Sequence, residues 1–122
     1  MQGSPGSYIL FLRLPRKRRI TVGKLGTITF PAGLYAYVGS ALNGWEARVN
    51  RHLTGGGKIH WHIDYLRAVA HVEGALVLES SERLECAMNE VIARTSLVVA
   101  PGFGSSDCEC LTHLHLLRTE PF

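Results

Sequence analysis

The sequence predicts an α/β (α+β) domain with a central, mostly antiparallel β-sheet flanked by helices. Residues 8–38 contain short runs of β-branched and aromatic residues separated by Gly and Pro, a pattern typical of strands joined by turns. Residues 44–54 and 84–92 instead repeat apolar side chains at helical spacing. The chain has 122 residues, 46% of them hydrophobic, which suits one domain over residues 1–122 with a buried core.

The first third of the chain is expected to be sheet. Tyr8–Leu14 alternates apolar with other residues, Pro15–Arg19 is turn-like and charged, and strand character resumes at Ile20–Val22. These three segments together predict a hairpin with a basic tip. Two further strands are expected at Thr27–Phe30 and Leu34–Val38, because a Pro-Ala-Gly break separates two runs of strand-forming residues.

The first helix is expected to begin after Asn43 and to end at Gly55. Asn43 can cap the helix while Glu46, three residues on, reaches back as in a capping box, and a run of glycines ends it. Its core stripe consists of Trp45, Val49 and Leu53.

Two polar residues share one flank of this stripe. On a helical wheel Arg48 and His52 fall together beside the apolar face, whereas Arg51 points further toward solvent. The helix is therefore expected to hold Arg48 and His52 half buried.

The next long helix is expected to have a serine cap before it. Its apolar stripe consists of Leu84, Ala87, Met88, Val91 and Ile92. Glu85 lies at the edge of this stripe, while Glu82 and Glu90 lie on the polar face. Glu85 is therefore the glutamate expected to look into a site at the sheet.

The remaining segments complete the expected fold. Tyr65–Ala70 is a candidate short helix and Val72–Leu78 is expected to be a buried strand. Val98–Ser106 is expected to be a loop, and Leu111–Leu117 a last strand with its two histidines on one face.

The positive charge of the chain is concentrated locally. The net charge is only +3, yet Arg13, Arg16, Lys17, Arg18 and Arg19 place five cations in seven positions. This favours contact with nucleic-acid phosphates, and a solvated turn that serves solubility is the plainer alternative. The sequence has no apolar stretch of the roughly 18 residues that span a bilayer and no signal-peptide pattern, so a cytoplasmic or nucleoid location without membrane contact is expected.

The three cysteines are expected to be reduced thiols, because their number is odd and Cys108 and Cys110 are too close in sequence for a disulfide scaffold. Cys108 and Cys110 can be drawn with His113 and His115 as a zinc quartet, but their spacing is not that of ordinary zinc fingers. The segment is therefore interpreted as a tight turn around Asp107 that packs the last strand.

Two tyrosine motifs and three later residues resemble the GIY-YIG nuclease superfamily. The motifs are Gly6-Ser7-Tyr8 and Tyr37-Val38-Gly39-Ser40, followed by Arg48 and His52 on one helix and Glu85 on another. Within that superfamily the chain looks like the compact Uri-type endonucleases, which are sometimes fused to DNA-repair glycosylases. The closer likeness runs through residues 33–41, 51–53, 60–64 and 102–108.

The run Gly33-Leu34-Tyr35 also spells the first motif almost literally. Tyr35 lies only two residues from Tyr37, however, and therefore on the same strand. Because the superfamily places its two tyrosines on neighbouring strands, the resemblance assigns Tyr8 to the first motif. The link between the two motifs is much longer here than the usual short hairpin.

The resemblance implies a metal-dependent endonuclease that hydrolyses DNA phosphodiester bonds in repair or processing. A tyrosine, Tyr8 or Tyr37, would activate water, and Arg48 would clamp the phosphate. His52 would orient groups or shuttle protons, and Glu85 would hold Mg²⁺ or Mn²⁺ with waters. The expected DNA contacts are Arg16, Lys17, Arg18, Arg19, Arg51, His60 and His62.

Two other classes of function stay open from the sequence. The main alternative is a noncatalytic nucleic-acid-binding module on the same scaffold, and the third is a structural or protein-interaction domain. Recognition of branched or damaged DNA would need a second copy or a repair-protein partner, because a compact domain has little surface with which to read bases.

Overall fold

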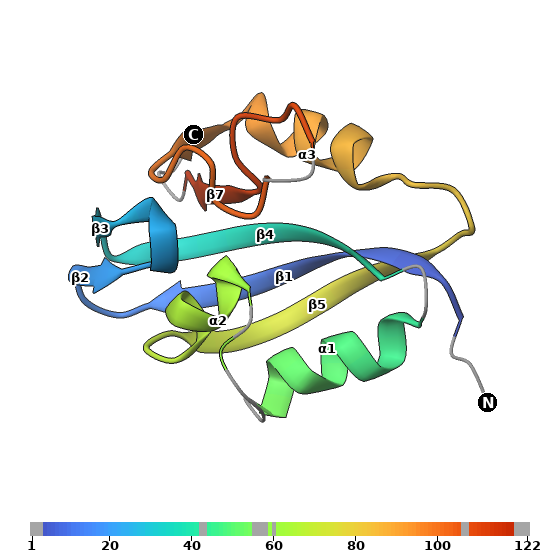
Figure 1. Ribbon diagram of the computed structural model, residues 1–122, viewed down its shortest axis with the longest axis horizontal. Helices are drawn as coiled ribbons and strands as arrows, with labels where there is room; N and C mark the ends of the chain where they lie inside the picture. Colours follow the sequence, from blue (N-terminus) through green and yellow to red (C-terminus); the bar gives the residue numbers. More distant parts are fainter. Residues whose placement is uncertain (1–3, 42–43, 55–58, 60, 106–107, 119–122) are drawn as a thin grey trace.

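The computed structural model describes residues 4–41, 44–54, 59, 61–105 and 108–118. Within these residues the chain forms a five-stranded sheet in the order β5-β1-β4-β7-β6 and a separate two-stranded ribbon of β2 and β3 (Figure 1). All the strand pairs in both sheets are antiparallel. The expected α+β class with a central antiparallel sheet is confirmed.

The bounds of the elements are as follows. The strands are β1 (Gly6–Leu14), β2 (Arg18–Thr21), β3 (Thr27–Phe30), β4 (Gly33–Ala41), β5 (His71–Glu79), β6 (Ser96–Val98) and β7 (Leu114–Leu117). The α-helices are α1 (Trp45–Thr54), α2 (His62–Arg67) and α3 (Glu85–Ala93), and a 3-10 turn, η1, spans Gly23–Leu25. Among the described residues, none of the helices is both long and apolar enough to cross a bilayer.

The larger core lies on the face of the sheet that α1 and α2 cover. Tyr8, Leu10 and Leu12 alternate along β1 and point to this face, where they join Val49 of α1 and Leu66 of α2. All three β1 side chains are 1% exposed or less.

A smaller core lies on the opposite face. The alternate residue Ile9 of β1 packs there with Ala36 and Val38 of β4. Met88 and Ile92 of α3 cover them, and Figure 1 shows α1 and α3 on opposite sides of the strands. Because both faces of β1 and β4 are covered, these two strands are apolar on both sides.

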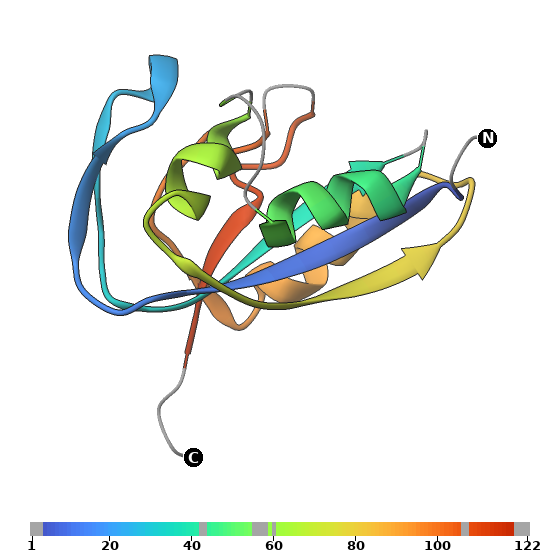
Figure 2. The same cartoon turned by 90° about the horizontal axis from the view of Figure 1, so that it is seen from below.

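The predicted hairpin between Tyr8–Leu14 and Ile20–Val22 is wrong. Strand β1 pairs along its whole length with β4, in the register that sets Tyr8 opposite Gly39, and its other edge pairs with β5. Strand β2 pairs with β3 instead. The side chains of Arg18 and Arg19 are exposed, so β2 cannot lie inside a sheet that is buried on both faces. Figure 2 shows the β2–β3 ribbon standing away from the sheet at one end.

The expected buried strand at Val72–Leu78 is an edge strand. Strand β5 pairs with β1 within the described residues, and most of its side chains are exposed, including Leu76 at 53% and Leu78 at 45%. Helix α3 lies against β4 and β6 and so leaves this part of the sheet face uncovered. Helix α1 packs against β5 on the other face of the sheet, so the apolar run is covered on one face only.

Helix α1 faces the sheet with a different stripe from the predicted one. Leu53 is 48% exposed, whereas His52, expected to be half buried, is 1% exposed. The helix turns His52 inward because its ring has a hydrogen-bond partner in the core, the hydroxyl of Tyr8. The predicted cap at Asn43 and the end at Gly55 lie outside the described residues.

Helix α3 is also rotated relative to its predicted stripe. Ala87 and Val91 are exposed, and Asn89 is buried in their place. The amide of Asn89 donates to the Thr112 carbonyl at 2.8 Å and its oxygen lies 2.5 Å from Nε2 of His115. These bonds satisfy a buried polar group, so the side chain can face the sheet. The expected serine cap is absent from the described helix, whose N-cap residue is Leu84 with no side-chain cap bond.

Three other boundaries differ from the sequence predictions. Helix α2 begins at His62 because the Asp64 carboxylate accepts the Trp61 amide at 2.8 Å and closes the first turn. The short strand β6 begins just before the predicted loop, and β7 begins at Leu114, three residues late.

Candidate functional site

Tyr8 and Tyr37 are close neighbours on the same face of the sheet. Tyr8 lies on β1 and Tyr37 on β4, and the register pairs Tyr8 with Gly39 and Leu10 with Tyr37. The two tyrosines are therefore diagonal neighbours across adjacent strands, with ring centroids 6.5 Å apart. The long link between them forms the β2–β3 ribbon, which leaves the central pairing intact.

Two glycines hold the tyrosine rings in place. A Cβ atom on Gly39 would lie 2.4 Å from Cζ of Tyr8, so the ring of Tyr8 lies directly across the backbone of Gly39. A Cβ atom on Gly104 would lie 2.8 Å from Cε1 of Tyr37, and Gly104 has a φ of +68°, which side-chain-bearing residues rarely adopt. Both glycines are therefore required by close approach of a tyrosine.

Tyr35, whose sequence context also spells the first motif, has a structural contact instead. Its hydroxyl donates to the carbonyl of Pro31 at 2.6 Å, and its ring packs edge-on against Phe30. Tyr35 is 0% exposed and belongs to the core.

His52 joins the two tyrosines from helix α1. Its Nε2 lies 2.9 Å from the hydroxyl of Tyr8, and its ring centroid is 6.4 Å from that of Tyr37. Burial lowers the pKa of His52 to about 4, so the ring is neutral at neutral pH. A neutral imidazole can accept a proton from a phenol or orient its hydroxyl.

Arg48 places a positive charge near Tyr8 and His52. Its Nη1 donates to the carbonyl of Ser40 at 2.5 Å, and its guanidinium lies over the ring of Trp61, 4.4 Å from the centroid. The bond to Ser40 occupies one of the five N–H donors of the guanidinium. Burial raises the pKa of Tyr8, and the positive charge of Arg48 opposes that rise. The cation is thus placed to stabilise negative charge beside the phenol.

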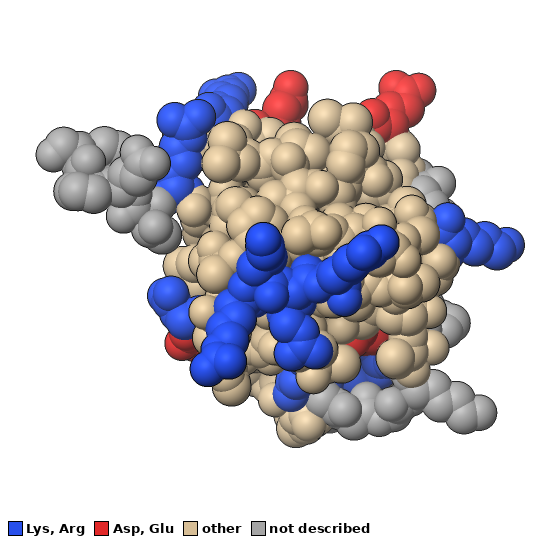
Figure 3. All heavy atoms as spheres, turned by 90° about the vertical axis from the view of Figure 1, so that its left-hand side faces the viewer, with Lys and Arg blue, Asp and Glu red and all other residues tan. Residues whose placement is uncertain are grey.

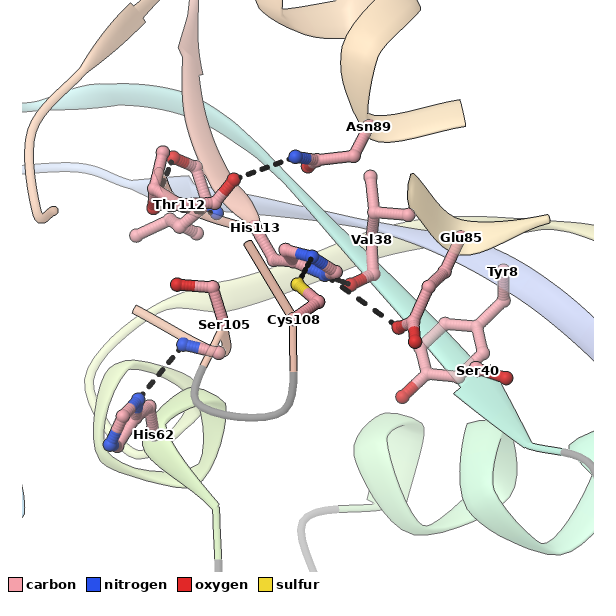
Figure 4. A network of polar contacts seen from close by, with 12 residues as sticks. Tyr8, Val38, Ser40, His62, Glu85, Asn89, Ser105, Cys108, Thr112 and His113 are labelled. Atoms are coloured by element: carbon pink, nitrogen blue, oxygen red, sulfur yellow. Dashed lines mark hydrogen bonds and ion pairs between the residues drawn. The ribbon is translucent and has the colours of Figure 1, made fainter. Parts of the chain in front are cut away.

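Glu85 reaches the site from the first turn of α3. Its side chain is 20% exposed and its Oε2 lies 3.7 Å from Nδ1 of His113, beyond hydrogen-bonding distance. Figure 4 shows the carboxylate directed toward Tyr8 and His113. Its negative charge contributes to the raised pKa of Tyr8 and of Tyr37, after the larger effect of burial. Glu90 is exposed, as the helical wheel predicts, and Glu82 is exposed in the segment before α3.

Arg51 and His62, two expected DNA contacts, are engaged within the protein. Arg51 forms two bonds with the Asp64 carboxylate, at 2.9 and 3.0 Å, and lies over Trp61 at 4.7 Å. The expectation that Arg51 points toward solvent is therefore wrong, because the Asp64 carboxylate, whose side chain is 10% exposed, binds it. Nδ1 of His62 accepts the Gly104 amide at 2.8 Å. The third such residue, His60, lies outside the described residues.

The basic segment lies apart from the tyrosines. Arg16, Lys17, Arg18 and Arg19 are all exposed, at the turn after β1 and on β2. Figure 3 looks onto this end of the molecule and shows Lys and Arg side chains gathered there. The strand from Tyr8 to Leu14 separates the two regions by about 20 Å at the usual rise per residue.

Four potential metal ligands lie together beside Glu85. The ligand atoms of Cys86, Cys108, Cys110 and His113 are all within 4.8 Å of one another, so this group could hold a metal ion. Sequence reasoning weighed His115 in place of Cys86 and set the quartet aside. His115 instead contacts Asn89. In the sequence, the feature that could have pointed to Cys86 as a fourth ligand is its position next to Glu85 on the same helical turn.

The fold and the site define an α+β domain with a buried tyrosine–histidine pair, a flanking arginine and glutamate, and an adjacent thiol cluster. Residues 7–121 match the family described as domain of unknown function DUF123, and the chain belongs to that family. No curated protein and no solved structure matches the chain.

Proposed function

We propose that this protein is a metal-dependent endonuclease that hydrolyses DNA phosphodiester bonds by a GIY-YIG-type mechanism. The observation that carries the proposal is the bond between Tyr8 and His52, formed beside Tyr37. Arg48 and Glu85 act electrostatically on the same phenol from two other elements. The convergence of these residue types supports the resemblance to the GIY-YIG superfamily and its Uri-type members.

The residues divide the work of hydrolysis among them. A bond forms between a water oxygen and phosphorus while the bond to the 3′ or 5′ oxygen breaks. Tyr8 takes a proton from that water as its own proton passes to the neutral ring of His52. Arg48 neutralises charge on the phosphoryl oxygens. The ring of Tyr37 contacts the phosphate beside Tyr8.

Glu85 is the residue that would hold Mg²⁺ or Mn²⁺. Its carboxylate is partly exposed, and its Oε2 lies 3.7 Å from Nδ1 of His113. A single carboxylate with access to solvent suits Mg²⁺, which keeps several of its waters. When bound, the ion supplies charge stabilisation to the leaving oxygen.

The exposed cations provide the second contact with DNA. About 20 Å of B-form duplex corresponds to roughly six base pairs, each with a phosphate on either strand. A duplex centred on Tyr8 therefore reaches Arg16, Lys17, Arg18 and Arg19. We further propose that the protein acts in the cytoplasm on branched or damaged DNA. It would recognise such DNA together with a second copy of itself or with a repair-protein partner.

One observation favours the second candidate function, a noncatalytic nucleic-acid-binding module. Tyr8 is 1% exposed and Tyr37 is 8% exposed, so a phosphate reaches the phenols only if neighbouring side chains such as Arg48 move. A module of this kind would use the basic end of the molecule and leave the tyrosines as core residues.

A nicking assay separates the two functions. Supercoiled plasmid, a four-way junction and single-stranded DNA are incubated with the protein and Mg²⁺ or Mn²⁺, and the Tyr37→Phe, Arg48→Ala and Glu85→Ala variants are run beside it. The nuclease proposal expects cleavage by the wild type, at least about 100-fold slower cleavage by Arg48→Ala and by Glu85→Ala, and a smaller loss for Tyr37→Phe, which keeps the aromatic ring. A variant that carries all three changes gives the background rate. If the wild type binds DNA in a salt-sensitive way but cleaves it no faster than this variant, the protein is a binding module instead.

A further inference from the structure

Beyond the proposed nuclease activity, we propose that Cys86, Cys108, Cys110 and His113 form a structural Zn²⁺ site. Three thiols and one imidazole are a donor set that Zn²⁺ takes in closed, four-coordinate sites. The ligand atoms already lie within 4.8 Å of one another, and Sγ of Cys108 is 3.1 Å from Nε2 of His113. A tetrahedral zinc with usual bond lengths needs ligand separations of about 3.5–3.8 Å, so small side-chain movements suffice.

The hydrogen bonding of His113 prepares it as a ligand. Its Nδ1 lies 3.0 Å from the carbonyl oxygen of Val38, and a carbonyl can only accept. Nδ1 therefore carries the proton of the neutral ring, and Nε2 presents its lone pair toward Cys108 (Figure 4). Metal-bound histidines in proteins are commonly oriented by this kind of second hydrogen bond. The ring is 1% exposed, so its direction is fixed by the surrounding core.

The four ligands come from two separate parts of the chain. Cys108, Cys110 and His113 lie within six residues of one another in the segment before β7, and Cys86 lies in the first turn of α3. The three thiols are not bridged to one another. Binding would join a loop with little secondary structure of its own to a helix.

The site would also fix Glu85. Glu85 precedes Cys86 in the same helical turn, and His113 is bonded to Val38, the neighbour of Tyr37 on β4. Zinc would therefore hold the end of α3 that carries the glutamate against the strand that carries the tyrosine. This is a positioning role, and it does not depend on whether the tyrosines catalyse a reaction.

The test measures metal content and metal binding, not cleavage. Protein purified under reducing conditions without chelator is analysed by mass spectrometry of its metals, and about one zinc per chain is expected. The stripped protein is then titrated with Co²⁺, which should produce the visible bands of a tetrahedral site and near-ultraviolet thiolate charge transfer. Removal of zinc should lower the melting midpoint by roughly 10 °C.

Variants identify the ligands. Cys86→Ser changes an exposed side chain, so the fold should survive, and its affinity for Co²⁺ should fall at least about 100-fold. His115→Gln is the matched control, because His115 lies two residues from His113 but contacts Asn89. The control should bind Co²⁺ as the wild type does.

Three results would overturn the proposal. The first is wild-type protein that contains no zinc and gives no Co²⁺ bands. The second is Cys86→Ser protein with undiminished affinity. The third is a disulfide between two of the three cysteines in protein isolated without air, shown by fewer than three titratable thiols after chelation.

Discussion

The hydroxyl of Tyr8 and Nε2 of His52 lie 2.9 Å apart in the core, where a sheet strand and a helix meet. Both side chains are 1% exposed, and Tyr35, on the adjacent strand β4, is as deeply buried in the same core with its hydroxyl bonded to a backbone carbonyl. The two tyrosines therefore offer a matched pair, one bonded to an imidazole and one to the backbone.

Tyr8→Phe and Tyr35→Phe should differ in activity but not in stability. Each change removes one buried hydrogen bond, and each should lower the free energy of unfolding by about 1 kcal/mol. Only Tyr8→Phe removes the proposed proton path to His52, so its cleavage rate should fall at least about 100-fold. Denaturant unfolding and single-turnover cleavage of one DNA substrate measure both quantities. Equal cleavage by the two variants would contradict the assigned role of Tyr8.

Gly39→Ala should displace the ring of Tyr8. The added methyl group would meet Cζ at 2.4 Å, so the ring or the strand must move, at a cost of about 1–3 kcal/mol in unfolding free energy. Gly74→Ala, on β5, is the control, because a Cβ atom there meets nothing within 4 Å. Urea unfolding should show a loss for the first variant and little change for the second. A neutral Gly39→Ala would mean that Tyr8 does not lie across this backbone.

The stability of the protein should fall between pH 6.5 and pH 4, and His52 contributes to this fall together with His115, whose pKa burial also lowers to about 4. The pKa of His52 is lowered to about 4, chiefly by burial, so the unfolded chain binds a proton at this position before the folded chain does. Stability from this group is complete above pH 6.5 and is lost as the pH falls toward 4, by about 3 kcal/mol in all.

Denaturant unfolding at several pH values tests this effect. His52→Gln should reduce the loss of stability between pH 7 and pH 4 by about 3 kcal/mol, while His71→Gln, which changes an exposed histidine, should leave the loss as it is in the wild type. An unchanged pH profile for His52→Gln would show that the buried ring does not titrate as described.

Neutralising the basic segment should weaken DNA binding without slowing the bound enzyme. Replacement of Arg16, Lys17, Arg18 and Arg19 with Gln should reduce the slope of log K against log salt by up to about 4. Replacement of Arg83 and Arg94, two exposed arginines beside α3, is the control and should change the slope little. Fluorescence anisotropy over a salt series measures the slope. An unaltered slope would remove this segment from the DNA interface.

The sequence predicted the parts of this fold that depend on local patterns. Residue patterns placed the strands β1 and β4, and the helical wheel set Glu85 apart from Glu90. The choice of Tyr8 over Tyr35 as the partner of Tyr37 came from the resemblance to the GIY-YIG superfamily, which places its two tyrosines on neighbouring strands.

Other features depended on contacts that are distant in sequence. His52 replaces Leu53 in the core because Tyr8, 44 residues away, bonds to its ring. Asn89 is buried because its amide meets Thr112, 23 residues further on. Cys86 lies beside Cys108 only once α3 packs on β4, so no spacing rule for zinc fingers detects it. In each case tertiary pairing of a polar group overrides the local apolar pattern.

The proposed metal-binding role of Glu85 is tested by the Mg²⁺ dependence of single-turnover DNA cleavage by Glu85→Gln. The cleavage rate should be at least about 100-fold below that of the wild type at saturating DNA, with DNA affinity retained. Glu82→Gln, which changes an exposed glutamate before the same helix, should cleave normally. Cleavage by Glu85→Gln at the wild-type rate and Mg²⁺ dependence would contradict this role.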